Sequence, residues 1–396
     1  MWVPMQGSRP LFVVVDTTAF RADMRLGSAA WQQTLALSGR GVLQLHIPTV
    51  VIRETVRHYE RETDRAAREI RKGFGPLRRL GVDIDSKYQE EIEKKAAWAT
   101  DEYEPWIRAK LGAAGANIIP LPKIAHSDLL DWDLRGRKPF NVNGKGYRDA
   151  LIWASIVELC AALTALDTLI IVTDNSDDFC GADKTTIAQE LVEDLPTGVL
   201  VLRYPNLKSM LIEHAWPTEA GPTPTLAPDS PFMELLKEAV ASACDHLIGN
   251  EVEDPYSPDE FRRGLDFDFG DSPLPRGLET ITVESVDPDF DALDWEVYDT
   301  LDDGTLLAKV YIDAAVILDG FMHHADYYAS EDDVEVHDPD WNEHYAWVYV
   351  ERNVRLTFNT VIDGDLTSIS EVEFDSASAL LPHTEGGDGP DATSPS

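Results

Sequence analysis

The stretch GKGYRDALIWASIVELCAALTALDTLIIVTDNSDDF, residues 144–179, decides the fold of the chain around it. It predicts an apolar helix over Ala150–Leu166, with Asp149 in its first turn. A β-branched run over Thr168–Thr173 follows, and because it has no polar alternation it predicts a strand buried on both faces. Such a helix and strand are typical of an α/β fold.

Acidic residues stand directly after this strand. They are Asp174, Asp177 and Asp178, in a turn that also holds Asn175. Ligands of open α/β sheets collect at the carboxyl ends of the strands. A strand that returns to the sheet after the helix can bring Asp149 to the same edge.

The residues on either side of this stretch repeat the pattern. Leu11–Val15 is a short apolar strand followed by Asp16, and Val42–Ile47 is a second strand. The helix over Val50–Arg79 then carries Glu54 in its opening turns. The alternation of strand and helix predicts a doubly wound parallel sheet. The remaining elements expected here are helices over Trp31–Ser38, Ser86–Leu111 (kinked or split near Pro105) and Asn206–His214, strands over Ile118–Leu121 and Val199–Arg203, and a polar loop over His126–Asn143.

Four or more carboxylates at one sheet edge repel one another unless a cation lies between them. Oxygen ligands without sulfur or nitrogen suit magnesium or manganese. Such an ion lowers the pKa of bound water and holds a phosphoryl group for in-line attack. The predicted chemistry is therefore hydrolysis of a phosphodiester.

Four motifs, FVVVDTT, TVVIRE, GYRDALIW and VTDNSDDF, resemble in order and spacing those of the PIN-domain superfamily of metal-dependent nucleases. The resemblance covers roughly residues 10–215 and implies a PIN-like α/β/α sandwich with a central parallel sheet. The stretch Leu77–Asn141 is long for the small toxin members, which points to a larger subgroup.

The resemblance implies a role for each matching acid. Asp16, Glu54 and Asp149 match the first three acids of the family, as catalytic residues and metal ligands. Asp178 matches one position for the fourth acid, and Asn175 stands where some members carry it. Asp174 is a further candidate ligand, so that Asp174, Asn175, Asp177 and Asp178 all stay open for completing the site.

The resemblance also implies an activity. It is endonucleolytic, usually on RNA, with Mg²⁺ or Mn²⁺ as cofactor and a toxin-like, defence or RNA-processing role. Thr17, Lys145, Arg148 and Asn175 are expected to orient substrate or ligands. Single-stranded DNA is an alternative substrate, and a degenerate PIN-like module that binds RNA or protein without cleavage is the alternative function.

Competing roles exist for several residues. Asp16 and Asp149 are also suitable helix N-caps. Cys180 beside Asp178 is a weak candidate nucleophile, because no histidine partner is evident. A zinc-like site in the second half is a further alternative, without compact ligand spacing; its candidate ligands are His323, His324, His337, His344, Asp326, Asp338 and Asp340.

Charge divides the chain into two parts. Residues 1–220 hold 27 Lys and Arg against 30 Asp and Glu, whereas the remaining residues hold 7 against 41, so their net charges are −3 and −34. The basic residues along the helix over Val50–Arg79 are expected to form a solvated face with Glu–Arg pairs, and a phosphate track is the alternative; the residues concerned are Arg57, Arg61, Arg65, Arg68 and Lys72. The acidic part repels a polyanion over a Debye length of about 8 Å at physiological salt.

Composition predicts the domain boundaries. Five prolines between Pro217 and Pro231 indicate an exposed linker. The predicted layout is a nuclease domain over 1–215, a linker over 216–231, an acidic α+β domain over 232–381 and a disordered tail over 382–396. The acidic domain is expected to pair a helix over Phe232–Ile248 with an antiparallel sheet. Its charge suits a domain that binds a protein partner or inhibits the first domain, and acidity that serves solubility alone explains it at least as well. Its expected strands are Leu278–Val286, Leu293–Leu301, Leu306–Leu318, His344–Val361 and Ser368–Phe374.

Cysteine usage and hydropathy predict the location. Cys160, Cys180 and Cys244 show no paired spacing, which favours a reducing cytoplasm. No secretory signal or membrane span is expected, because the longest apolar stretch, Ala150–Val172, is broken by Glu158 and Asp167.

Overall fold

The computed structural model describes residues 11–80, 86–141, 145–164, 167–214, 216, 221–254, 256, 264–270, 273–329 and 334–380. The chain divides into two compact units, Met1–Pro217 and Thr218–Ser396, and each is described by itself. The tail expected over 382–396 lies outside the described residues.

The described part of the first unit contains a five-stranded parallel sheet in the order β3-β2-β1-β4-β5. The strands are β1 (Leu11–Val15), β2 (Leu43–Pro48), β3 (Asn117–Ile119), β4 (Thr168–Val172) and β5 (Leu200–Tyr204). β1 lies between β2 and β4, and Val15 pairs with Val172. The residues that follow these two strands, Asp16 and Thr173, therefore lie side by side at the carboxyl edge.

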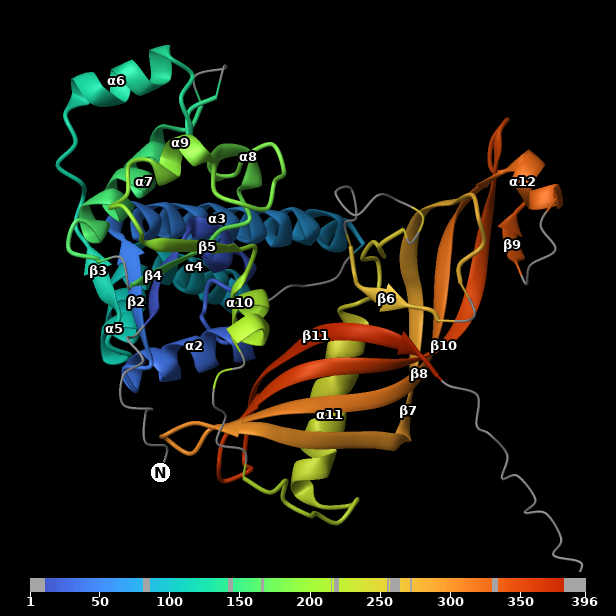
Figure 1. Ribbon diagram of the computed structural model, residues 1–396. Coiled ribbons are helices and arrows are strands. Elements are labelled where there is room, and N and C mark those ends of the chain that lie inside the picture. The colour runs from blue at the N-terminus through green and yellow to red at the C-terminus, as the bar shows by residue number, and fades with distance from the viewer. Residues whose placement is uncertain are drawn as a thin grey trace, which may run out of the picture. The chain divides into compact units, whose positions relative to one another are not determined.

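Helices flank this sheet, as Figure 1 shows. They are α1 (Thr17–Ala22), α2 (Ala29–Gly39), α3 (Thr49–Arg79), α4 (Ser86–Asp101), α5 (Tyr103–Ala113), α6 (His126–Leu134), α7 (Tyr147–Cys160), α8 (Ser176–Phe179), α9 (Gln189–Val192) and α10 (Leu207–His214). The parallel sheet flanked by helices confirms the predicted α/β fold.

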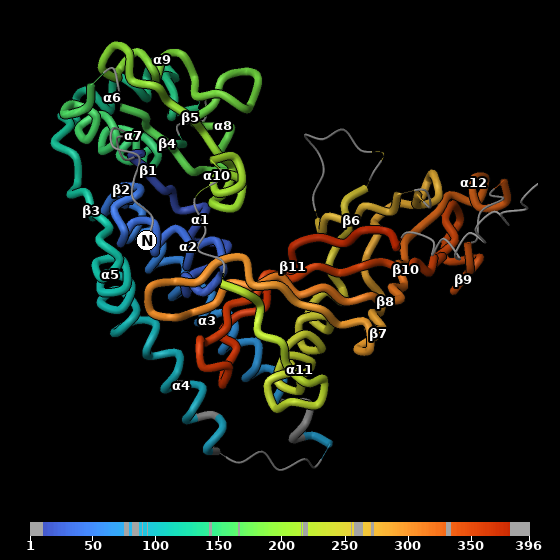
Figure 2. Tube along the Cα trace, turned by 60° about the horizontal axis from the view of Figure 1, so that its bottom comes forward, coloured from blue at the N-terminus to red at the C-terminus, as the bar shows by residue number. Residues whose placement is uncertain are grey.

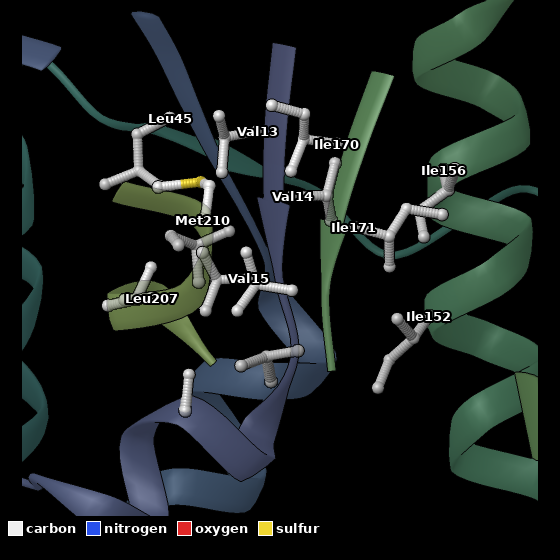
Figure 3. Packing of buried hydrophobic residues seen from close by; sticks show 14 of the residues in the cluster. Val13, Val14, Val15, Leu45, Ile152, Ile156, Ile170, Ile171, Leu207 and Met210 are labelled. Carbon is white, nitrogen blue, oxygen red and sulfur yellow. The ribbon is translucent and has the colours of Figure 1, made fainter. Parts of the chain in front are cut away.

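The core lies on both faces of the sheet, as expected for strands without polar alternation. Figure 3 shows Val13 and Val15 directed toward Leu207 and Met210 of α10, whereas Val14 and Ile171 face α7. On α7 the contact is made by the buried side chains of Ile152 and Ile156. Burial of the central strand from two sides fixes the direction of its carboxyl end, and hence of Asp16.

Two predictions about helix bounds are wrong. The polar loop expected over His126–Asn143 contains α6, because Leu129 packs with Phe140 and Ala150 in a small apolar cluster. The helix expected to reach Leu166 ends as α7 at Cys160. In the loop beyond this end, the Asp167 carboxylate accepts hydrogen bonds from the amide and hydroxyl of Thr164 at 2.7 and 2.8 Å.

The described part of the second unit is an α+β fold with a mostly antiparallel sheet in the order β6-β11-β10-β8-β7, and β9 pairs with β10. Its elements are α11 (Pro231–Asp245), β6 (Phe267–Asp268), β7 (Leu278–Thr300), β8 (Leu306–His323), α12 (His324–Ala329), β9 (Glu335–Asp338), β10 (Tyr345–Ile362) and β11 (Ile369–Ala379). Figures 1 and 2 show β7, β8, β10 and β11 running side by side, with α11 against one face. The predicted antiparallel sheet is confirmed, and the structure adds the short strands β6 and β9 to it.

The prediction of two separate strands over Leu278–Val286 and Leu293–Leu301 is wrong in one respect. The structure has one long strand, β7, whose pairing with β8 shifts in register between Asp289 and Asp294. The Asp- and Pro-rich segment that interrupts the apolar alternation is therefore an irregularity within one strand and not a connection. None of the described helices has the length and apolar character that crossing a membrane requires.

Candidate functional site

Asp16 ends the central strand and begins α1. Its carboxylate accepts hydrogen bonds from the amide of Thr17 at 2.6 Å and from the hydroxyls of Thr173 and Thr18 at 2.8 and 3.4 Å. The side chain is buried, with 4% of its surface exposed. Burial raises the pKa of Asp16, and the charge of Glu54 raises it further. The hydrogen bonds that the carboxylate accepts lower this pKa and so act in the opposite direction. The N-cap role is thus real, and it places the carboxylate at the sheet edge.

Glu54 lies in the second turn of α3 and has two different surroundings. Its Oε2 atom accepts a hydrogen bond from the Thr17 hydroxyl at 3.1 Å. Its Oε1 atom pairs with the Arg148 guanidinium and lies 3.7 Å from Nε2 of His58. Glu54, with 13% of its side chain exposed, therefore lies between the acidic edge of the sheet and a basic surface.

Asp149 lies in the first turn of α7, whose N-cap is Gly146, so the alternative that Asp149 itself is the N-cap is wrong. The Asn175 amide donates to Oδ1 of Asp149 at 3.1 Å and to Oδ2 of Asp178 at 3.0 Å. Burial raises the pKa of Asp149 to about 6, and the charges of Asp16, Asp178 and Glu54 contribute. Asp149 therefore shares one electrostatic environment with three other carboxylates.

The four candidates of the last motif have different positions. Asn175 is the N-cap of α8 and holds Asp178 toward Asp149. Asp177 points away, since its carboxylate pairs with Lys184 and 81% of its side chain is exposed. Hydrogen bonding to Lys184 lowers the pKa of Asp177. Asp174 is exposed, and it is its backbone amide that bonds to the Thr18 hydroxyl, at 3.0 Å.

The structure thus brings together Asp16, Glu54, Asp149 and Asp178, which we call the carboxylate site. Of the residues expected to orient substrate, Thr17, Arg148 and Asn175 contact these carboxylates directly. Lys145 is exposed, and its backbone amide bonds to Asn141 at 3.3 Å.

Sequence reasoning missed three residues that contact the site, namely Thr18, Thr173 and His58. Thr173 is fully buried and donates to Asp16, and its position as the last residue of the β-branched run marked it as a neighbour of a strand end. His58 lies four residues after Glu54 on the same helix, a spacing that places two side chains on one face. Burial, followed by the charge of Arg21, lowers the pKa of His58.

The donor set fits a hard divalent cation. Its oxygen donors are carboxylates, and the charges of Asp16, Asp178 and Glu54 all raise the pKa of Asp149. A doubly charged ion removes this repulsion. Within the part of the chain that the structure describes, no three carboxylate, imidazole or thiol groups are already arranged to hold a metal ion. The carboxylate site therefore suits a divalent cation by the type of its donor atoms. In this structure Arg148 and Asn175 are bonded to its oxygens.

Neither the zinc-like site considered for the second unit nor Cys180 as a nucleophile is supported by the described residues. His337 bonds to Glu284 at 2.9 Å and packs against the rings of Trp347 and Tyr349, so it belongs to the packing of the second sheet. Among the described residues the histidines of this unit form no metal-binding group. Cys180 is buried, and burial raises the pKa of its thiol, which disfavours a nucleophilic thiolate.

Gly146 positions the start of α7, and this leads to a prediction. Its φ of 115° disfavours other residues, and a Cβ atom there would clash with the Pro139 carbonyl oxygen. We expect Gly146→Ala to displace Arg148 and Asp149 and to destabilise the fold by about 1–3 kcal/mol. Denaturant unfolding and nuclease assays measure both effects. Gly136→Ala is the matched control, since its φ is also positive (58°) but no atom lies within 4 Å of the added Cβ; equal losses in both variants would contradict the positioning role.

The PIN domain family model matches residues 13–179, which include every member of the carboxylate site. No family model matches the second unit. No curated protein and no solved structure was found to match the chain.

Proposed function

We propose that the first unit of this chain, which contains a PIN domain, is a divalent-metal-dependent endonuclease that hydrolyses phosphodiester bonds in RNA. The observation that carries the proposal is the shared environment of Asp149, whose pKa is raised to about 6 by burial and by three further carboxylates. Repulsion of this kind is costly to a fold and is typical of sites that bind a cation.

Asp16, Glu54, Asp149 and Asp178 are the residues that would hold Mg²⁺ or Mn²⁺. A bound ion of this type supplies an activated water and stabilises the charge that develops on the phosphate. Thr17 and Thr173 hold the carboxylates of Glu54 and Asp16 in place by hydrogen bonds. Asn175 spans Asp149 and Asp178 in the same way, so hydrogen bonds hold these two carboxylates near each other.

Arg148 is the residue of the site best suited to bind the scissile phosphate. It lies next to Asp149 in the sequence, pairs with Glu54, and keeps 59% of its side chain exposed. A guanidinium presents several donors in a plane that matches two phosphate oxygens.

We place the reaction in the cytoplasm, in keeping with the three buried and unpaired cysteines.

Incubation with defined nucleic acids tests the proposal. Single-stranded RNA, structured RNA and single-stranded DNA of matched sequence are exposed to the full chain with Mg²⁺, with Mn²⁺ and with a chelator. We expect internal cleavage of RNA that requires the metal. Binding without cleavage under every metal would identify a non-cleaving module instead, and faster cleavage of DNA would correct the substrate class.

The acidic second unit is proposed to inhibit the first by competing with the nucleic acid, since residues 221–396 carry a net charge of −34. Each unit has its own buried apolar cluster, so the first unit is expected to fold alone. We expect residues 1–217 to cleave RNA several-fold faster than the full chain at low salt. The difference should shrink toward 1 M salt, where the Debye length falls to about 3 Å. Equal rates at low salt would rule out inhibition by charge.

A further inference from the structure

A small pocket opens on the basic side of Glu54. Its volume is about 140 Å³, and its lining residues are Glu54, Arg57, His58, Arg61 and Arg148. The four residues from α3 follow the i, i+3, i+4, i+7 spacing of one helix face. Arg148 from the start of α7 completes the lining, so two elements far apart in the sequence form one concave surface.

The pocket concentrates positive charge. Three guanidiniums face one carboxylate, which gives a net charge of +2 when His58 is neutral. Within the described residues, neither Arg57 nor Arg61 has a side-chain hydrogen bond or ion pair. The exposed guanidiniums of Arg57 and Arg61 therefore have their donors available to a ligand that enters the pocket.

The basic residues further along α3 differ. Arg65 lies 3.7 Å from Glu62, the Arg68 guanidinium donates to the Asp64 carbonyl at 3.1 Å, and Lys72 pairs with Glu69 at 2.8 Å. These side chains are engaged by their own helix, as on a solvated face. The structure thus divides the basic residues considered for a phosphate track into those that line the pocket near Glu54 and those that are paired within α3.

Glu54 connects the pocket to the carboxylate site. One oxygen of its carboxylate meets Thr17, which adjoins Asp16, and the other meets Arg148 and His58 in the pocket. A ligand in the pocket would therefore contact Glu54, which is itself a member of the carboxylate site.

We propose that this pocket binds the terminal phosphate of a nucleic acid strand. A terminal phosphate monoester carries a charge of about −2 at neutral pH, matching the pocket, whereas an internal diester carries one negative charge. Guanidiniums bind phosphate oxygens in pairs. A pocket of this size accommodates the end of a strand better than a chain that continues on both sides. Resting on the proposed nuclease function, the consequence is cleavage close to a phosphorylated end.

Binding measurements test the pocket separately from catalysis. Fluorescence anisotropy compares three short single-stranded RNAs of one sequence, carrying a 5′-phosphate, a 3′-phosphate or hydroxyls at both ends, with the full chain in chelator. We expect one phosphorylated RNA to bind about tenfold more tightly than the hydroxyl form, as charge-assisted hydrogen bonds allow. The preferred RNA identifies the end that the pocket binds.

Matched variants on one helix assign the preference to the pocket. Arg57→Gln and Arg61→Gln should reduce the preference to near unity, whereas Arg65→Gln and Arg68→Gln should keep it while weakening binding of all three RNAs equally. Circular dichroism checks that each variant is folded. Equal affinities for the three RNAs, no binding of any, or a preference that survives in Arg61→Gln would overturn the proposal. Cleavage is measured apart, so a phosphate preference without cleavage would refute only the nuclease function.

Discussion

Replacement of Asp149 by Asn is expected to reduce metal-dependent cleavage by about 10²–10³-fold or more, the usual effect of removing a group that stabilises charge in the transition state. The change keeps the size of the side chain, and the amide oxygen can still accept the hydrogen bond from Asn175. It removes the negative charge that the proposed site needs to hold a cation. Single-turnover cleavage of a labelled RNA under Mg²⁺ or Mn²⁺ measures the loss.

Asp177→Asn is the control for this substitution. Asp177 lies in the same acidic motif as Asp178, but its carboxylate is exposed and pairs with Lys184. We expect this variant to cleave at the rate of the unaltered chain. If Asp149→Asn also cleaved at that rate, the carboxylate site would not be the active site; if both variants lost activity together, the loss would reflect general damage to the region.

The sequence predicts the first unit well because its signals are local. The β-branched runs at Leu11–Val15 and Thr168–Val172 cannot be exposed on either face, and this alone implies a parallel sheet covered by helices. Their ends then place Asp16 and Thr173 at one edge without knowledge of the packing. The short α6 was missed because a single buried residue, Leu129, supports it and the contact it makes is tertiary.

The candidate site could be predicted only in part. The acids of the carboxylate site follow strands or begin helices, so their approximate place could be inferred from the sequence. Which acid of the last motif faces Asp149 could not, because it depends on the single turn of α8 that Asn175 caps. The pocket beside Glu54 depends on how α7 approaches α3, a tertiary contact that no local pattern encodes.

Asp149→Asn is also expected to stabilise the metal-free protein near neutral pH. The folded-state pKa of Asp149 is about 6, above its ordinary value of 3.8, so the folded chain holds a proton that the unfolded chain releases between these values. The stability that this proton confers is present at low pH and is lost as the pH rises from about 4 through about 6. Above that range, a shift of about two units costs at most about 3 kcal/mol, and Asn avoids the cost.

Urea unfolding in chelator from pH 4 to pH 8 measures this effect. The variant and the unaltered chain should have similar free energies of unfolding near pH 4, and the variant should become the more stable of the two above pH 6. Asp177→Asn should show no such gain, because the pKa of Asp177 is lowered and not raised. Added Mn²⁺ should reverse the order, since an ion that binds only the folded state stabilises it by mass action and the variant has lost a ligand. A variant that is no more stable than the unaltered chain at pH 8 without metal would mean that Asp149 is not under the repulsion from which the cation site is inferred.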